Sequence, residues 1–190
     1  MKSLYVDFDE DKIISNLEDV VPLFPLGNMV FFPNTVIPLH IFEERYKQMI
    51  DDSVSSHNLI CMTLMQDDMK DDDLAISKIG CVGRIISNEE GEEGKKNIIL
   101  YGITRIHIDE IIYSKPYRQA KINIIKSKKT SDNDPLYKRI TDLVGEWNLL
   151  LEDYNDNYKI KVDQSSTLSK LTDSLSSIIV SSPSERQYLL

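Results

Sequence analysis

The pattern of apolar residues changes once along this 190-residue chain, near residue 130. Before that point, apolar residues form short runs and alternations that are broken by Gly, Pro and acidic clusters. After it, they recur every three or four positions, which is typical of amphipathic helices. The pattern predicts an α+β protein with a β-rich unit over residues 20–127 and a helical unit over 132–190. Residues 1–19 are expected to be an N-terminal extension.

The first unit contains several short apolar segments that we interpret as strands. Prolines interrupt the segments at 21–26 and 36–41, and a proline follows the segment at 29–32, so none is expected to form a helix or a fully paired central strand. Residues 79–87 and 98–108 flank a glutamate-rich stretch and predict a long hairpin with a solvated tip. Six or so short strands, the others at 58–66 and 120–124, fit a small, partly closed β-barrel.

One short helix is expected within this first unit. After residue 41 the apolar spacing becomes helical, and Phe42, Tyr46, Met49 and Ile50 fall on one face. Glutamates at the start of this segment suit the positive end of the helix dipole. The sequence therefore predicts a β-barrel with one early helix.

The second unit is expected to contain three helices. Asp134 can cap the first helix, with Pro135 in its first turn, and residues 165–167 can cap a second helix that begins near Leu168. Residues 182–185 have the spacing of a capping box for a third. No helix-stop signal precedes Leu190, so we expect the sequence to end inside a helix and the natural chain to be longer. The first helix carries a continuous apolar stripe of Leu136, Ile140, Leu143, Val144, Trp147, Leu150, Leu151 and Tyr154.

The residues that would carry catalysis or bind a metal do not form a motif. His40, His57 and His107 are scattered, and neither a nucleophile elbow nor a phosphate-binding loop is present. Cys61 and Cys81 lie in apolar runs and are expected to be buried thiols. The acidic clusters match no calcium-loop pattern and are interpreted as solvated loops. We expect no catalytic residue, metal or cofactor, with a hydrolase of unrecognised type as one alternative.

The charge of the chain also limits its partners. The formal net charge is −9, and nucleic-acid affinity depends largely on cations that displace phosphate counterions. Nucleic acid is therefore not the expected partner. No apolar stretch reaches the roughly 20 residues of a membrane span, and the acidic N-terminus lacks the features of a signal peptide. We expect no membrane association and a cytoplasmic location.

The chain resembles the N-terminal domain of Lon protease. The resemblance begins with PLFPL at 22–26, VFFP at 30–33 and IPLHIFEERY at 37–46. It continues with IGCVGRI at 79–85, LYGITRI at 100–106 and PYRQA at 116–120, and ends with LTDSL at 171–175 and ERQYLL at 185–190. The same domain occurs in cereblon-type adaptors and in small stand-alone bacterial proteins, and the present chain resembles this stand-alone form.

The resemblance implies a PUA-like β-barrel followed by a helical bundle. It also implies a non-enzymatic role in proteolysis or protein quality control, in which the domain engages unfolded or tagged protein segments and a protease or chaperone. Two departures stand out: Glu44 replaces a proline that is frequent in the family, and the ATPase and Ser-Lys peptidase domains of full-length Lon are missing. Because PUA-like barrels often bind RNA, an RNA- or small-ligand-binding module is the alternative function.

The best-matching string supplies the first candidate protein-binding surface. Glu43, Arg45 and Tyr46 could form it together at the start of the early helix. The alternative is structural: Tyr46 packs on the barrel, while Arg45 pairs with a carboxylate or with main-chain carbonyls.

Two further groups complete the candidate surface. Met29, Phe31 and Phe32 lie in the most apolar short run near a turn, which predicts either a groove for exposed apolar segments or an inner strand. Tyr101 and Arg105 share one strand face, which either lines a shallow binding site or simply faces outward from a half-exposed sheet.

Overall fold

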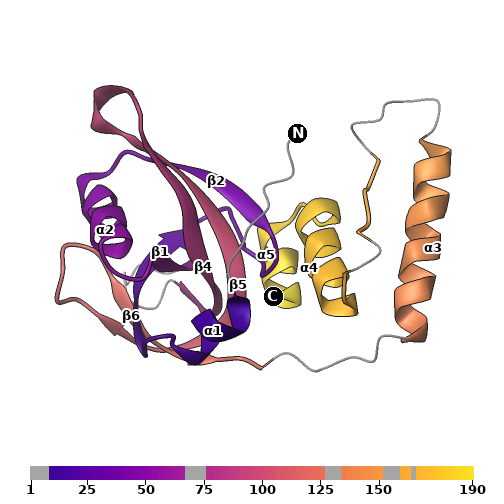
Figure 1. Ribbon diagram of the computed structural model, residues 1–190, viewed down its shortest axis with the longest axis horizontal. Helices are drawn as coiled ribbons and strands as arrows, with labels where there is room; N and C mark the ends of the chain where they lie inside the picture. Colours follow the sequence, from indigo (N-terminus) through magenta and orange to yellow (C-terminus); the bar gives the residue numbers. More distant parts are fainter. Residues whose placement is uncertain (1–8, 67–75, 127–133, 152–158, 164–165) are drawn as a thin grey trace.

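The computed structural model describes residues 9–66, 76–126, 134–151, 159–163 and 166–190. Figure 1 shows the strands gathered at one end of the molecule, α4 and α5 beside them, and α3 farthest from the strands. The predicted acidic loop at 67–73 and Tyr154 lie outside the described residues. The elements are α1 (Glu10–Ser15), β1 (Val20–Leu26), β2 (Val36–Ile41), α2 (Glu44–Val54), β3 (Leu59–Met65), β4 (Ile76–Glu90), the 3₁₀ turn η1 (Glu92–Gly94), β5 (Lys96–Ile112), β6 (Gln119–Ile124), α3 (Pro135–Leu150), α4 (Leu168–Ile179) and α5 (Pro183–Leu189).

The six described strands form one sheet in the order β2-β5-β4-β3-β1-β6. A further pairing of β5 with β6 joins the ends of five strands into a closed ring. The 17-residue β5 makes this possible, because its first part pairs with β2 and its last part pairs with β6. β1 and β3 are parallel, and the other pairs are antiparallel. The predicted α+β class is confirmed.

The two prolines of β1 are tolerated because its two neighbouring strands pair with different parts of it. Residues 20–22 pair with β6, and residues 23–26 pair with β3. Because no long stretch of β1 is paired on both sides, Pro22 and Pro25 remove few ladder bonds. β2 pairs only with β5 among the described strands, so its Pro38 also lies on an edge strand.

Residues 29–32, predicted as an extended segment, form no strand. They run instead as a buried connection against β5. A Cβ added at Gly102 would lie 2.1 Å from the main-chain oxygen of Phe32. A Cβ at Gly83 would lie 2.6 Å from Cε1 of Phe31. The two glycines therefore permit a close approach of this connection to the sheet.

The core lies inside the barrel and beneath α2. Tyr46, Met49 and Ile50 of α2 cover one side, as the helical spacing predicts. Phe42 does not belong to this face, because the helix begins at Glu44 and the Phe42 side chain is 62% exposed. The side chains that are fully or almost fully buried include Leu23, Phe32, Ile41, Ile60, Met62, Val82, Ile98, Leu100 and Ile106.

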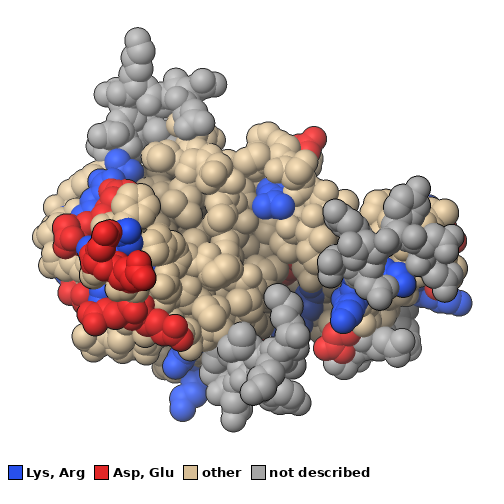
Figure 2. All heavy atoms as spheres, turned by 90° about the horizontal axis from the view of Figure 1, so that it is seen from above, with Lys and Arg blue, Asp and Glu red and all other residues tan. Residues whose placement is uncertain are grey.

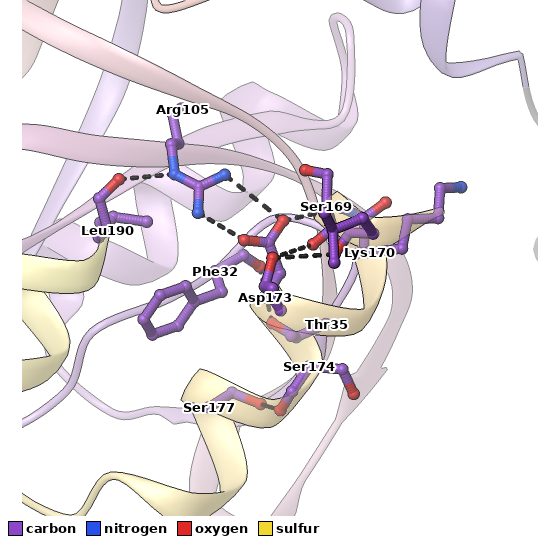
Figure 3. Close-up of polar contacts among 12 residues, drawn as sticks. Phe32, Thr35, Arg105, Ser169, Lys170, Asp173, Ser174, Ser177 and Leu190 are labelled. Atoms are coloured by element: carbon purple, nitrogen blue, oxygen red, sulfur yellow. Dashed lines mark hydrogen bonds and ion pairs between the residues drawn. The ribbon is translucent and has the colours of Figure 1, made fainter. Parts of the chain in front are cut away.

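A buried ion pair joins the helical part to the barrel (Figure 3). Arg105 on β5 donates from Nη2 to Asp173 Oδ1 on α4 at 2.5 Å, and Asp173 is only 2% exposed. Arg105 Nε also donates to the main-chain oxygen of Leu190 at 2.6 Å, and the amide of Asn34 donates to Asp173 Oδ2 at 3.1 Å. One arginine thus fixes the positions of α4 and of the residue that follows α5.

Helix caps confirm two of the three predicted helix starts in detail. The Asp134 carboxylate accepts from the amide of Leu136, and Pro135 occupies the first turn. Thr167 Oγ1 accepts from the amide of Lys170 at 3.3 Å. α5 begins where expected, but the capping-box bond does not form, since the Ser182 hydroxyl contacts the Ser184 hydroxyl instead. None of the described helices is both long and apolar enough to cross a membrane.

Candidate functional site

A groove of about 430 Å³ opens between the end of β1, the end of β2 and the start of α2. Its size falls within the range of roughly 300–1,000 Å³ that binding pockets usually occupy. Three of the predicted surface residues, Glu43, Arg45 and Tyr46, line it. The other lining residues are Phe24, Pro25, Leu26, Gly27, Leu39, His40, Ile41, Phe42, Met65 and Arg118.

The floor of the groove is aromatic and belongs to the core. The rings of Phe24 and Tyr46 meet edge to face, with centroids 4.6 Å apart and an interplanar angle of 65°. Both side chains are at least 92% buried, so they are held rigidly from below. Burial raises the pKa of Tyr46 above its ordinary value, and the nearby Arg45 guanidinium offsets part of that rise. The floor is therefore an uncharged aromatic surface at neutral pH.

The rim beside α2 carries a local ion pair. Glu43 is the N-cap residue of α2, but its side chain makes no capping bond. Its Oε2 accepts instead from Nε of Arg45 at 2.9 Å and lies 2.9 Å from Nη2 of the same residue. The Arg45 guanidinium lies over the Tyr46 ring, 4.6 Å from its centroid. Both charged side chains remain about half exposed.

Exposed apolar side chains continue the rim. Phe42 is 62% exposed and Met65 is 37% exposed, and both line the groove. The helical spacing predicted Phe42 on the buried face of the early helix, and none of Met65, Leu39 and Arg118 was predicted as a surface residue. The signal available for Phe42 was the Glu43-Glu44 pair, since acidic residues mark the first turn and leave the preceding residue outside the helix. Nothing in the local sequence marks Met65 or Arg118 as groove residues, because the barrel brings them to the groove from distant segments.

The structure places the remaining predicted surface residues elsewhere. Phe31 and Phe32 are 4% and 1% exposed, and Met29 packs against the core cluster. The two phenylalanines are therefore removed from the candidate surface, because a partner could reach them only by opening the barrel. Their alternative interpretation as an inner strand fits their burial but not their backbone, which forms no ladder.

Tyr101 and Arg105 hold other elements onto β5. Tyr101 Oη donates to Glu10 Oε1 of α1 at 2.8 Å. Burial, followed by this carboxylate, raises the pKa of Tyr101. Arg105 makes the buried contact with Asp173 described above. Both side chains thus act as structural links, and neither lines the groove.

A second, smaller cavity of about 120 Å³ contains a serine, a histidine and a carboxylate. Ser56 Oγ lies 2.8 Å from His57 Nδ1, and Glu18 Oε1 lies 3.5 Å from the same nitrogen. A catalytic relay needs the nucleophile and the acid on opposite nitrogens of the imidazole. This arrangement therefore lacks the geometry of a triad, and the Glu18 and His57 side chains are more than half exposed.

Among the other reactive groups in the described residues, His40 lines the groove, where its Nδ1 lies 2.6 Å from Oδ1 of Asn97. No cluster of His, Cys, Asp and Glu suited to a metal ion is found among them. Cys61 and Cys81 are free and buried, and burial raises the pKa of each thiol. Figure 2 shows acidic and basic side chains mixed at the end that carries α2 and the β4–β5 hairpin tip, next to a wide area without charged side chains.

Comparison with known proteins connects this architecture to one family. The family model described as the ATP-dependent protease La (LON) substrate-binding domain matches residues 20–190. The chain is 32% identical over 145 residues to the Lon protease of Flavobacterium johnsoniae, which covers 72% of this chain and 17% of that protein. It is 28% identical over 133 residues to the Lon protease of Dictyoglomus thermophilum, with 67% and 16% covered. The chain thus spans about one-sixth of the length of these relatives.

Two solved structures share the fold. The N-terminal domain of Mycobacterium avium complex Lon protease superimposes with a TM-score of 0.59 at 12% identity, covering 90% of this chain and 95% of that one. A Lon N-terminal domain protein from Xanthomonas campestris gives a TM-score of 0.57 at 20% identity, covering 69% and 74%. At these identities the two structures support the fold alone.

Proposed function

Because this chain belongs to the family of LON substrate-binding domains, we propose that it is a substrate-recognition domain that binds unfolded or tagged polypeptide segments through the groove at α2. The bound segments would be passed on for proteolysis or quality control. Curated relatives in which the matched region makes up about one-sixth of the length carry the name Lon protease, which supports a role beside a protease.

The observation that carries the proposal is the combination of an apolar floor and an adaptable rim. Phe24 and Tyr46 supply a preformed aromatic surface, and Phe42 exposes a ring beside it. A segment exposed by unfolding presents apolar side chains and charged neighbours together. The floor matches the apolar side chains, while Arg45 and Glu43 can contact charged or polar groups at the edge.

We also propose that the domain is not itself an enzyme. The matched region covers the substrate-binding part of Lon proteases and none of their remaining length. Among the described residues, Ser56 and His57 place a hydroxyl beside an imidazole, but Glu18 contacts the same nitrogen as Ser56 and does not complete a triad. Peptidase assays with and without ATP are expected to show no turnover by this chain.

The test is binding of a reduced, carboxymethylated model protein, followed by fluorescence anisotropy at micromolar concentrations of the domain. Phe42→Ser removes an exposed ring from the rim and should weaken binding by about tenfold, as truncation of an aromatic anchor does. Tyr113→Ser is the matched control, because Tyr113 is also about half exposed but lies outside the groove. It should leave the affinity unchanged.

Two outcomes would contradict the proposal. One is no interaction with the unfolded protein even at high micromolar concentration. The other is binding that Phe42→Ser and Tyr113→Ser weaken equally, which would place recognition away from the groove. RNA or small-ligand binding, the alternative, has no specific observation in its favour. A gel-shift titration at low salt tests it, because phosphate contacts weaken steeply with added salt.

A further inference from the structure

Helix α3 carries an apolar face that nothing in the described chain covers. Leu136, Leu143, Trp147 and Leu150 are 51–76% exposed, although the helix is 16 residues long and mostly apolar on this side. In Figure 1, α3 lies on the far side of α4 from the barrel. These apolar side chains are therefore not covered by packing against the barrel.

The spacing of this face is that of a coiled-coil seam. Leu136, Ile140, Leu143, Trp147 and Leu150 succeed one another at intervals of four, three, four and three residues. This alternation is the a/d pattern that lets side chains of two helices interdigitate. We refer to these five residues as the α3 seam.

A different face of α3 already has its partner. The side-chain amide of Asn148 donates to the main-chain oxygen of Ile160 at 2.9 Å, and its oxygen accepts from the amide of Ile160 at 2.8 Å. Val144, on the same face, is 7% exposed. The segment at 159–163 thus covers one side of α3 and leaves the α3 seam open.

We propose that the α3 seam packs antiparallel against the α3 seam of a second copy of this chain. The charges beside the seam favour this occupant. Arg139 and Glu146 both precede an a position by one residue, so they lie on the same edge of the seam. In an antiparallel pair with aligned centres, Arg139 of one copy lies near Glu146 of the other, and two-fold symmetry repeats the contact.

A parallel pair would lose this complementarity. It would place Arg139 and Glu146 beside the uncharged edge residues Val144 and Leu151 of the other helix. The helix as a whole also suits self-association, because its charged residues are two cations and two anions, Lys138, Arg139, Asp142 and Glu146. Two copies can therefore meet here without net repulsion, although the chain carries a charge of −9.

The test is a monomer–dimer equilibrium measured by analytical ultracentrifugation on the full chain. Trp147, the chain's single tryptophan, provides a second readout, because its emission should shift to the blue as the concentration rises and the ring is buried. Arg139→Glu and Glu146→Arg should each weaken the dimer by about tenfold, since each replaces two attractions with two repulsions. Lys138→Glu is the matched control, because it makes the same charge change away from the seam and should have no effect.

Mixing the two weakened variants gives the decisive result. An equimolar mixture of Arg139→Glu and Glu146→Arg restores both opposite-charge contacts between unlike chains, so the dimer should recover to the wild-type strength. Failure of this recovery, with circular dichroism showing both variants folded, overturns the antiparallel arrangement. A wild-type chain that stays monomeric through the micromolar range overturns the proposal altogether. So does a dimer that Leu143→Glu leaves intact.

Discussion

The barrel and α3 contain the same kinds of apolar side chain and bury them very differently. Leu100 and Ile106 of β5 are 0% exposed, whereas Leu143 of α3 is 55% exposed. The barrel closes on itself, so each strand finds a partner within the chain. α3 has one covered face and one open seam. Apolar periodicity therefore predicts that an element forms, but it does not say whether the surface that covers it comes from the same molecule.

The largest expected effect tests this comparison directly. Leu100→Ala should lower the free energy of unfolding by about 4 kcal/mol, because it leaves a cavity in a fully buried site. Leu143→Ala should change it by less than about 0.5 kcal/mol when the chain is monomeric. Urea unfolding of dilute protein measures both. Similar losses for the two variants would mean that α3 packs within its own chain.

The next effect concerns the link between the two regions. Asp173→Ala should cost about 3 kcal/mol, because it leaves the Arg105 guanidinium partly buried without its counter-charge. Hydrogen exchange should then accelerate in α4 and α5 more than in the strands of the barrel. Lys170→Ala serves as the control, because Lys170 also lies on α4 but its ammonium forms only a partly exposed ion pair, 3.6 Å from Glu10 Oε1. Uniform acceleration in all elements would show that the helices and the barrel unfold as one unit.

The smallest effect comes from Asp52, a partly exposed carboxylate that links α2 to the residues before β6. Asp52 of α2 accepts from Lys115 Nζ at 2.8 Å and from Tyr117 Oη at 2.7 Å. The Lys115 hydrogen bond, followed by the Tyr117 hydrogen bond, lowers the pKa of Asp52 below its ordinary value of 3.8. The folded state therefore binds this proton more weakly than the unfolded state does. The resulting stability is present above pH 3.8 and is lost as the pH falls through the lower folded value.

We expect Asp52→Asn to remove that part of the pH dependence. Because solvent reaches this partly exposed contact and screens it, the difference should stay below about 1 kcal/mol. Unfolding curves of the wild type and the variant between neutral pH and pH 2 measure it. If the free energies of unfolding of the two proteins change in parallel over this pH range, the Asp52 contact contributes nothing to stability. The buried Asp173 would then be the one of the two carboxylates that stabilises the fold.

The sequence predicted the order and the type of most elements. Strands β2, β3 and β6, the long hairpin and the starts of α3 and α4 follow from alternation, turn residues and caps, which are local signals. The sequence did not predict α1, and two further failures have physical reasons. Residues 29–32 were predicted to be an extended, apolar segment. They pack so closely on Gly102 of β5 that their side chains are held by burial, and they form no ladder of strand hydrogen bonds. Phe42 was assigned to a helix face, because its distance from Tyr46 is helical although the helix starts two residues later.

The candidate site was predictable only in part. Glu43, Arg45 and Tyr46 are consecutive or nearly so, and the resemblance to the family drew attention to them. Phe24, Met65 and Arg118 come from three other segments. They reach the same groove only because the end of β1, the end of β3 and the start of β6 lie on one side of the barrel. Arg105 was proposed as a surface residue, since nothing along the chain indicates that Asp173, 68 positions later, would be its partner.

By itself the sequence determined the local structure, the α+β class and the family, because these depend on short-range spacing and on strings of neighbouring residues. Only the tertiary structure decided which apolar residues are covered, which charges are paired and where the groove opens. Those properties depend on contacts between residues far apart in the chain. A phenylalanine or an arginine can be a buried structural residue or an exposed binding residue, and only its neighbours in space decide which.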